Sequence, residues 1–513
     1  MELLQNQYEM CQQKSKICAQ ITVDDDYIVK DTKPDVVKVI HGRGEVALEE
    51  IRVNKDAIWI MGKLCFSVLY LSDKETERLE SMESEIPFQE KLNMDGVDEN
   101  DDVDVRVTLE DLNISMINSR KLSIQALLEV LAKSTEATEA CLTVDVSEDV
   151  EKRTRQEEIL IPVEKLMHKE KLHQKYELPS SRQNIGKILF YMPQLSVVES
   201  MLQDGKVSFH GKLTIGVIYQ TIAGDGLEWY EIDDAFHFEL PVENTMEGDL
   251  VWADVILEQS KLTPEEDYDG ELRQMSFDYT ILVRGQIYRE EQVEYLKDLY
   301  SLHKNYSVER TTCGCYKFLM KNVAKNRVSQ QMQLEPVKPK MLSICTSAGS
   351  VEVDRVKVEN NGLTLEGILK TELIYMTSSD SVPMAATCGQ MEFKQFVEIK
   401  GMHEGTEYAL NLSMESLQMN LLDHSSYEVL ATISVGVLAY DHMEIDNISH
   451  VEELEEDMDK NQPGIIGYSV KEGETIWDIA KKYRCTIEDL KRTNELTNGE
   501  LSANQKLLVV KFL

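Results

Sequence analysis

Apolar and polar residues alternate with a period of two along three separate segments of the chain, residues 58–70, 207–219 and 363–375. A period of two over this length predicts a β-strand with one buried face. In each segment a glycine stands eight residues before a tyrosine: Gly62 and Tyr70, Gly211 and Tyr219, and Gly367 and Tyr375. A glycine inside such a strand indicates a bulge, a bend or the close approach of another backbone.

The three segments belong to a longer internal repeat. A second alternating stretch follows each glycine by 62 to 66 residues, at 124–130, 277–283 and 429–435. The glycines themselves are 149 and 156 residues apart. Several alternating strands in each unit predict a sandwich or a barrel. We therefore expect a mainly β protein with three tandem β-rich modules, sandwich- or barrel-like.

The repeat divides the chain into five regions. We expect β repeat 1 over residues 1–140, a connector plus β repeat 2 over 141–291, a connector plus β repeat 3 over 292–446, an acidic linker over 447–465, and a small C-terminal domain over 466–513. The connectors are charged, and a short helix is expected over 295–302. The linker has no apolar periodicity and its acidic run ends in Pro463-Gly464, which is typical of an extended tether.

Charge and cysteine usage restrict the function. The chain has 92 acidic and 54 basic residues, a formal net charge of −38. This balance argues against nucleic-acid binding, which needs a basic face, and against attachment to anionic lipid by charge. The nine cysteines form no C-x-x-C pair, which favours reduced thiols inside a cell. The first residues lack the basic and apolar regions of a signal peptide, and no apolar run is long enough to span a bilayer.

Motifs of catalysis are missing. The sequence contains no G-x-S-x-G, G-x-x-x-x-G-K-[ST], H-E-x-x-H or G-x-G-x-x-G pattern. Cys313 and Cys315 are the closest pair of cysteines, and a zinc site would need two further ligands at fitting distance, so we expect reduced thiols. Three similar modules multiply surfaces, whereas a catalytic site needs unlike groups that converge once. We expect no enzyme, no cofactor and no metal.

The C-terminal region predicts a strand, two short helices and a second strand. An alternating run over 468–470 precedes Thr475 and Thr486, and each threonine is followed three residues later by an aspartate. That spacing is a helix-start signal, since the threonine hydroxyl and the acid cap the first turn. An apolar run over 507–510 supplies the second strand, so the order is βααβ.

This pattern resembles the LysM domain. The motif is Tyr468-x-Val470-x-x-Gly473-Glu474-Thr475-Ile476-x-x-Ile479-Ala480, then Leu490, Asn494 and Leu496, then Leu501-x-x-x-Gln505-x-Leu507-x-Val509. LysM domains hold N-acetylglucosamine polymers between the first strand–helix turn and the loop after the second helix. The resemblance implies a groove formed by Gly473, Glu474, Thr475, Ile476, Trp477, Asn494, Glu495, Leu496 and Thr497.

Two positions depart from the LysM pattern and weigh against glycan binding. Glu474 stands where the family usually has aspartate, and Asn504 where it usually has glycine. Trp477 has two interpretations, a ring that stacks on a sugar and a packing residue of the first helix.

The repeats resemble the SPOCS domain of spore-coat proteins. The resemblance rests on residues 26–40, which contain Pro34-Asp35, followed by the strand with the glycine and the tyrosine. Tandem SPOCS-like repeats that end in one LysM domain are similar to the clostridial coat morphogenetic family that binds stage IV sporulation protein A, the ATPase that polymerises around the forespore.

This likeness implies a non-enzymatic scaffold in the mother-cell cytoplasm, at the forespore surface, that docks onto the coat ATPase through its LysM-like groove and contacts other coat proteins. The alternative is a protein that binds N-acetylglucosamine polymers of cell wall or cortex. The lack of an export signal favours a protein ligand for the groove, without nucleic acid and without membrane insertion.

Overall fold

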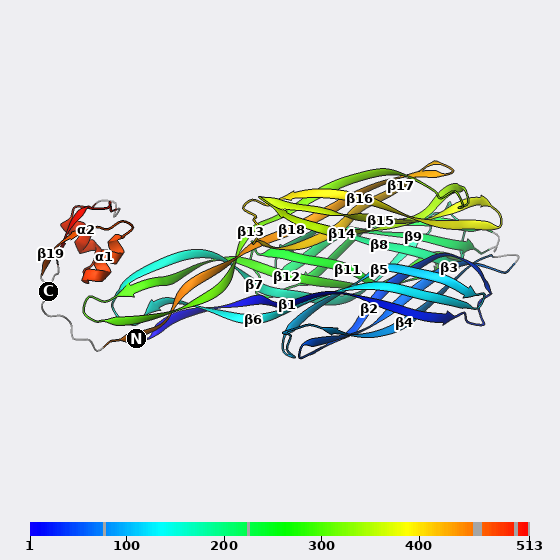
Figure 1. Ribbon diagram of the computed structural model, residues 1–513. Helices are drawn as coiled ribbons and strands as arrows, with labels where there is room; N and C mark the ends of the chain where they lie inside the picture. The colour runs from blue at the N-terminus through cyan, green and yellow to red at the C-terminus, as the bar shows by residue number, and fades with distance from the viewer. Residues whose placement is uncertain (75–77, 223–225, 455–463, 497–500, 511–513) are drawn as a thin grey trace.

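The computed structural model describes residues 1–74, 78–222, 226–454, 464–496 and 501–510, and in these the chain is built almost entirely of β-strands. Figure 1 shows the three modules side by side, with long ribbons that extend from them towards a small helical domain. The mainly β fold predicted from the period of two is confirmed. Within the described residues, no helix has the length and apolar character needed to cross a membrane.

The first module is a sandwich of two three-stranded antiparallel sheets. One sheet has the order β1-β6-β5 and the other β2-β3-β4. Their facing side chains, such as Leu64 of β3 and Leu128 of β6, share one apolar core. The strands are β1 (Leu3–Ile28), β2 (Val36–Asn54), β3 (Ala57–Ser72), β4 (Leu79–Asn93), β5 (Asp102–Asn118) and β6 (Lys121–Val146).

The second and third modules repeat this plan, and one of their sheets is shared. The second module pairs β10-β9-β8 with β11-β12-β7, and the third pairs β14-β15-β16 with β13-β18-β17. A bridge between Tyr316 and Leu160 joins β13 to β7, so a six-stranded sheet runs through both modules. The strands are β7 (Glu151–Glu177), β8 (Ile185–Gln203), β9 (Lys206–Thr221), β10 (Leu227–Pro241), β11 (Leu250–Glu266), β12 (Leu272–Tyr300), β13 (Tyr306–Gln333), β14 (Met341–Glu359), β15 (Gly362–Ser379), β16 (Val382–Glu398), β17 (Glu407–Asp423) and β18 (Ser426–Glu453).

The three glycine–tyrosine pairs occupy one structural position. Each glycine lies on the central strand of its sheet, opposite a phenylalanine: Gly62 opposite Phe88, Gly211 opposite Phe236, and Gly367 opposite Phe393. Each tyrosine hydroxyl donates to the backbone carbonyl 36 residues earlier, at 3.4, 3.2 and 3.1 Å; the pairs are Tyr70 with Pro34, Tyr219 with Gln183, and Tyr375 with Pro339. The internal repeat is therefore a repeat of tertiary contacts as well as of sequence.

The segments interpreted as connectors are strands. β7 and β13 pair along their length with β12 and β18, and the helix expected over 295–302 is wrong because β12 continues to Tyr300. These strands are long ribbons with one face exposed, and their polar residues concealed the alternation. Beyond the sandwiches, residues 1–10 with 137–146, 151–162 with 288–300, and 306–316 with 442–453 form three ribbons that we call the stalk (Figure 1).

The stalk has an apolar core of its own. Buried side chains come from all three ribbons: Met10, Ala140 and Leu142 of the first, Ile159, Val293 and Tyr295 of the second, and Cys315 and Ile445 of the third. A second cluster, nearer the ribbon ends, contains Val146, Leu296, Leu299, Ile448 and Val451. All three modules are thus joined by packing at the stalk, and the second and third are joined by the shared sheet as well.

The C-terminal domain has the predicted βααβ order. It contains β19 (Ile465–Ser469), α1 (Ile476–Tyr483), α2 (Ile487–Thr493) and β20 (Lys506–Val510), and β19 pairs antiparallel with β20. Thr475 and Asp478 form a reciprocal capping box at the start of α1, as their spacing predicts. The acidic linker expected over 447–465 does not begin as a tether, because residues 447–453 belong to β18 and pair with β13. Ile465 begins β19, and residues 455–463 lie outside the described residues.

Candidate functional site

The first side of the predicted groove is the turn between β19 and α1. Gly473 has a φ of +82°, which favours glycine, and it is exposed. The Glu474 carboxylate accepts hydrogen bonds from the Lys471 backbone N–H at 2.9 Å and from the Tyr468 hydroxyl at 2.7 Å. The bond from Lys471, followed by that from Tyr468, holds the pKa of Glu474 below its ordinary value. The longer glutamate therefore fastens the turn to β19.

The two residues that follow differ in accessibility. Thr475 is exposed, and its hydroxyl is engaged with Asp478 as the N-cap of α1. Ile476 is half-buried and packs on the apolar core of the domain. Leu496, from the opposite side of the predicted groove, packs on that same core. The two sides of the groove are therefore joined through one small core.

The second side of the groove follows α2. The Asn494 amide donates to the carbonyls of Leu490 and Leu508, at 2.9 and 2.8 Å, and its Oδ1 accepts from the Leu508 N–H at 2.6 Å. Asn494 thus joins α2 to β20, and its polar groups are occupied. Glu495 is exposed, with a φ of +52°. Thr497 lies outside the described residues.

Asn504 has a physical reason for standing in place of glycine. Its φ is +66°, in the left-handed region, and asparagine tolerates this region better than most residues. Its N–H donates to the Val470 carbonyl at 2.8 Å, which connects the turn before β20 to the end of β19. The substitution therefore preserves the LysM-like backbone.

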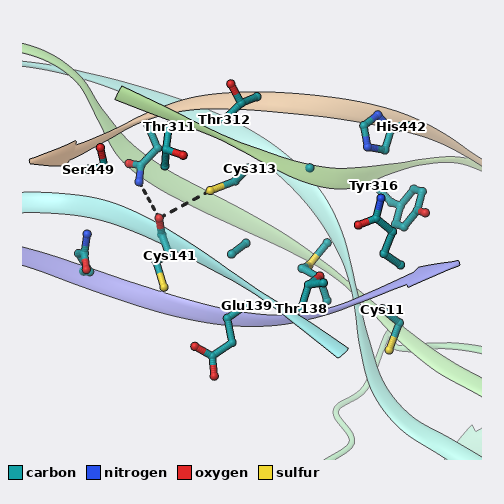
Figure 2. A pocket seen from close by; sticks show the side chains of 16 residues that line it. Cys11, Thr138, Glu139, Cys141, Thr311, Thr312, Cys313, Tyr316, His442 and Ser449 are labelled. Carbon is teal, nitrogen blue, oxygen red and sulfur yellow. Dashed lines mark hydrogen bonds between the residues drawn. The ribbon is translucent and has the colours of Figure 1, made fainter. Parts of the chain in front are cut away.

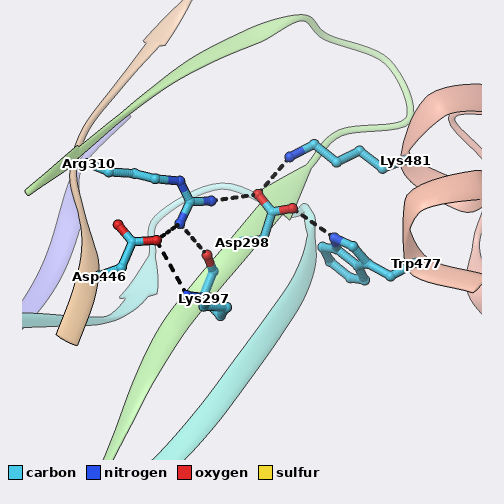
Figure 3. Close-up of polar contacts among 6 residues, drawn as sticks. All are labelled: Lys297, Asp298, Arg310, Asp446, Trp477 and Lys481. Carbon is cyan, nitrogen blue, oxygen red and sulfur yellow. Dashed lines mark hydrogen bonds and ion pairs between the residues drawn. The ribbon is translucent and has the colours of Figure 1, made fainter. Parts of the chain in front are cut away.

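Trp477 points from α1 into the stalk. It is 5% exposed, its indole N–H donates to Asp298 of β12 at 2.8 Å, and its ring stands edge-on to Tyr300, with centroids 5.0 Å apart (Figure 3). Of its two interpretations, the packing role describes its position here. No signal in the sequence relates residue 477 to residue 298.

Asp298 is the centre of a charged network beside Trp477. Its carboxylate also lies 2.6 Å from the Lys481 ammonium and 3.1 Å from the Arg310 guanidinium (Figure 3). Burial acts to raise the pKa of Asp298, but hydrogen bonds from Lys481 and Trp477 outweigh burial and keep that pKa below its ordinary value. The carboxylate is therefore ionised and holds a cation from α1.

Two further contacts complete the attachment of the domain. The buried Tyr300 hydroxyl donates to the Cys485 carbonyl at 2.8 Å, and the Arg484 guanidinium donates to the Asn305 side chain at 2.8 Å. Tyr300 and Leu302 pack in the same apolar cluster as the core of the domain. The small domain thus docks on the end of the stalk.

A second candidate site is a cavity of about 350 Å³ within the stalk. Cys11, Cys141 and Cys313 line it together with Tyr316 and His442 (Figure 2). Burial raises the pKa of Cys313, which makes its thiol a weak nucleophile. Among the described residues, no group of three or more histidine, cysteine or acidic side chains is placed to hold a metal ion. The cavity has no arrangement of groups that indicates a reaction.

Comparison with known families places two kinds of domain in the chain. A model described as SipL, SPOCS domain matches residues 35–117 and 340–422, and the LysM domain model matches residues 468–510. Comparisons with curated proteins and with solved structures gave no match. Both domains are non-enzymatic binding domains. The chain therefore contains two SPOCS domains, in its first and third modules, and a C-terminal LysM domain.

Proposed function

We propose that the protein is a non-enzymatic spore-coat scaffold that docks through its LysM domain onto the coat-assembly ATPase, a relative of stage IV sporulation protein A. The observation that carries this proposal is the presence of two SPOCS domains and one LysM domain on a single chain. In the proposal, the modules supply surfaces for other coat proteins, and the protein acts in the mother-cell cytoplasm at the forespore surface. The domain division, 1–140, 141–291, 292–446, 447–465 and 466–513, is part of it, with the first three boundaries moved to the ends of the strands that cross them, Val146 of β6, Tyr300 of β12 and Glu453 of β18.

The surface proposed to meet the ATPase is the part of the groove that the chain itself leaves open. Gly473, Thr475 and Glu495 are exposed, and Ile476 and Leu496 are half-buried. A protein ligand would bury these apolar side chains, and protein interfaces concentrate their energy in such residues. Trp477 belongs to this surface only if the domain leaves the stalk.

Capture of the purified coat ATPase by the full-length chain tests the proposal. Deletion of 466–513 should abolish capture, and Glu495→Lys should weaken it by reversing an exposed charge at the rim. Glu488→Lys is the matched control, since Glu488 is also exposed and lies on α2 outside the predicted groove. Leu496→Ala should abolish capture while circular dichroism reports a folded domain.

The second candidate is binding of N-acetylglucosamine polymers, which the LysM match favours. Titration of the full chain with chitohexaose separates the two candidates. Tight binding of the oligosaccharide, together with normal ATPase capture by Glu495→Lys and Leu496→Ala, would overturn the ATPase proposal in favour of the glycan.

A further inference from the structure

Two exposed histidines face each other on the three-stranded β10-β9-β8 sheet of the second module. His210 of β9 and His237 of β10 are directly opposite in the antiparallel register. Their rings lie 4.6 Å apart between centroids, and their Nδ1 atoms are 3.2 Å apart. Both side chains are exposed, so the space beside the two nitrogens is open to solvent.

The distance between the two nitrogens matches that of a chelate. Imidazole nitrogens bind Zn²⁺ at about 2.0–2.1 Å, and a tetrahedral angle between two such bonds separates the nitrogens by about 3.3–3.4 Å. The separation of 3.2 Å between the Nδ1 atoms is close to this distance. A single hydrogen bond between the two Nδ1 atoms also fits this distance. Without the shared proton, both nitrogens have a lone pair that can bind a metal ion.

Two carboxylates are neighbours of the histidine pair in the sheet. Glu199 of β8 is the register partner of His210 on the other side, so a glutamate and two histidines form one row across three strands. Glu239 lies with its Oε1 3.6 Å from Nε2 of His237. Histidines that ligate a metal usually donate their other ring N–H to a carboxylate, which fixes the tautomer. Glu239 is the carboxylate beside that nitrogen of His237, and its other oxygen accepts from Lys206 at 2.9 Å.

The other two modules show that the fold does not require histidines at this position. The residue before the central glycine and its partner on the next strand are Met61 and Gln89 in the first module. In the third module they are Glu366 and Lys394, which form an ion pair at 2.6 Å. The histidine pair is therefore a property of the middle module.

We propose that His210 and His237 bind one divalent transition-metal ion, such as Zn²⁺, Ni²⁺ or Cu²⁺, through their Nδ1 atoms. Imidazole suits these ions, and water fills the coordination positions that the protein leaves open. Glu239 acts as the outer carboxylate on Nε2 of His237. The site is independent of the LysM domain and of the function proposed for it.

Titration of the full-length chain with Zn²⁺, in competition with a chromophoric chelator, tests the site. The double variant His210→Glu/His237→Lys reproduces the ion pair of the third module and should lose one equivalent of bound Zn²⁺. Both proteins contain the same nine cysteines, so binding to thiols cancels in the comparison. Without metal, the urea unfolding midpoints of the two proteins should agree, because the third module has the same glutamate–lysine pair at the equivalent position.

Glu239→Gln is the second variant, and it should weaken Zn²⁺ binding at this site by about tenfold, the low end of what loss of an outer ligand costs. Equal Zn²⁺ stoichiometry in the wild type and the double variant would overturn the proposal. So would a wild type that binds no Zn²⁺ under conditions in which the chain is folded.

Discussion

Trp477 of α1 donates its indole N–H to Asp298 of β12 at 2.8 Å, across 179 residues of sequence. One residue of the predicted groove is therefore engaged inside the protein. A ligand that needs the Trp477 ring must first displace the LysM domain from the stalk, whereas a ligand of the exposed turn at Gly473 need not. The docked position thus divides the predicted groove into an open part and an occupied part.

Asp298→Ala should release the LysM domain from the stalk. The substitution removes the partner of both Trp477 and Lys481, and hydrogen bonds to a charged group contribute about 1.5–3 kcal/mol each. Hydrogen–deuterium exchange should rise in α1 and around Tyr300. Asp446→Ala is the control, since Asp446 pairs with Arg310 and Lys297 but not with the LysM domain. Equal exchange in the two variants would contradict this prediction.

The docking should depend on pH only in acid. The pKa of Asp298 is lower when the domain is docked, so protons favour the released state. The contribution of Asp298 is complete above the ordinary aspartate pKa of about 3.9 and is lost as the pH falls below that value. Tryptophan emission should stay constant from neutral pH to about pH 5 and shift to the red below about pH 4. The same scan on Trp477→Phe should lack the shift; a shift of equal size there would place its origin elsewhere.

Alanine at the three central glycines should destabilise their modules. A Cβ would lie 2.6 Å from the Ala47 carbonyl oxygen at Gly62, 2.0 Å from that of Ser196 at Gly211, and 2.1 Å from that of Glu352 at Gly367. Relief of such contacts by backbone shifts costs about 1–3 kcal/mol. Urea unfolding measures the effect.

Gly467→Ala is the matched control for these glycines. Gly467 also lies in a strand, and a Cβ there would meet no atom within 4 Å. It should leave the unfolding midpoint of the modules unchanged. A loss of stability as large as that of Gly211→Ala would show that the close backbone contact is not the cause of the destabilisation.

Tyr375→Phe should lower the free energy of unfolding by about 1 kcal/mol, the usual net contribution of one hydrogen bond. The lost bond joins the Tyr375 hydroxyl to the Pro339 carbonyl at 3.1 Å, and it fixes the segment that leads into β14. Tyr268→Phe is the control, because Tyr268 is fully exposed. Thermal unfolding compares the two variants. If Tyr375→Phe leaves the unfolding temperature unchanged, this hydrogen bond does not stabilise the protein.

The sequence predicts best where one face of a strand is buried against a single core. Alternation around Gly211 therefore identifies β9, and the Thr475 cap identifies α1. The stalk ribbons gave a weaker signal, because their exposed face carries charge and their apolar residues meet partners from other modules. Because of this weak signal, a short helix is expected over 295–302, although Tyr295 and Tyr300 are buried in β12.

In the candidate site, too, contacts within one element could be predicted from the sequence, whereas contacts between distant elements could not. Local contacts such as Thr475 with Asp478 follow from spacing. The partnership of Trp477 with Asp298 depends on how the LysM domain meets the stalk, and neither residue type nor spacing encodes it. The histidine pair is intermediate, since His210 is one residue from the repeat glycine, but only the register of β9 and β10 places His237 opposite it.

The stalk also determines the order in which parts of the protein can fold during translation. Each module can close its own sandwich once its last strand has left the ribosome, since β1 pairs with β6, β7 with β12, and β13 with β18. The apolar core of the stalk takes residues from all three modules, such as Met10, Ile159 and Ile445. It therefore cannot be completed until β18 has been synthesised. The LysM domain is translated after that point, so it reaches the end of β12 when the third ribbon is available to support Arg310 beside Asp298. A nascent chain arrested within the third module would therefore expose apolar stalk surface to chaperones, although two of its sandwiches were already folded.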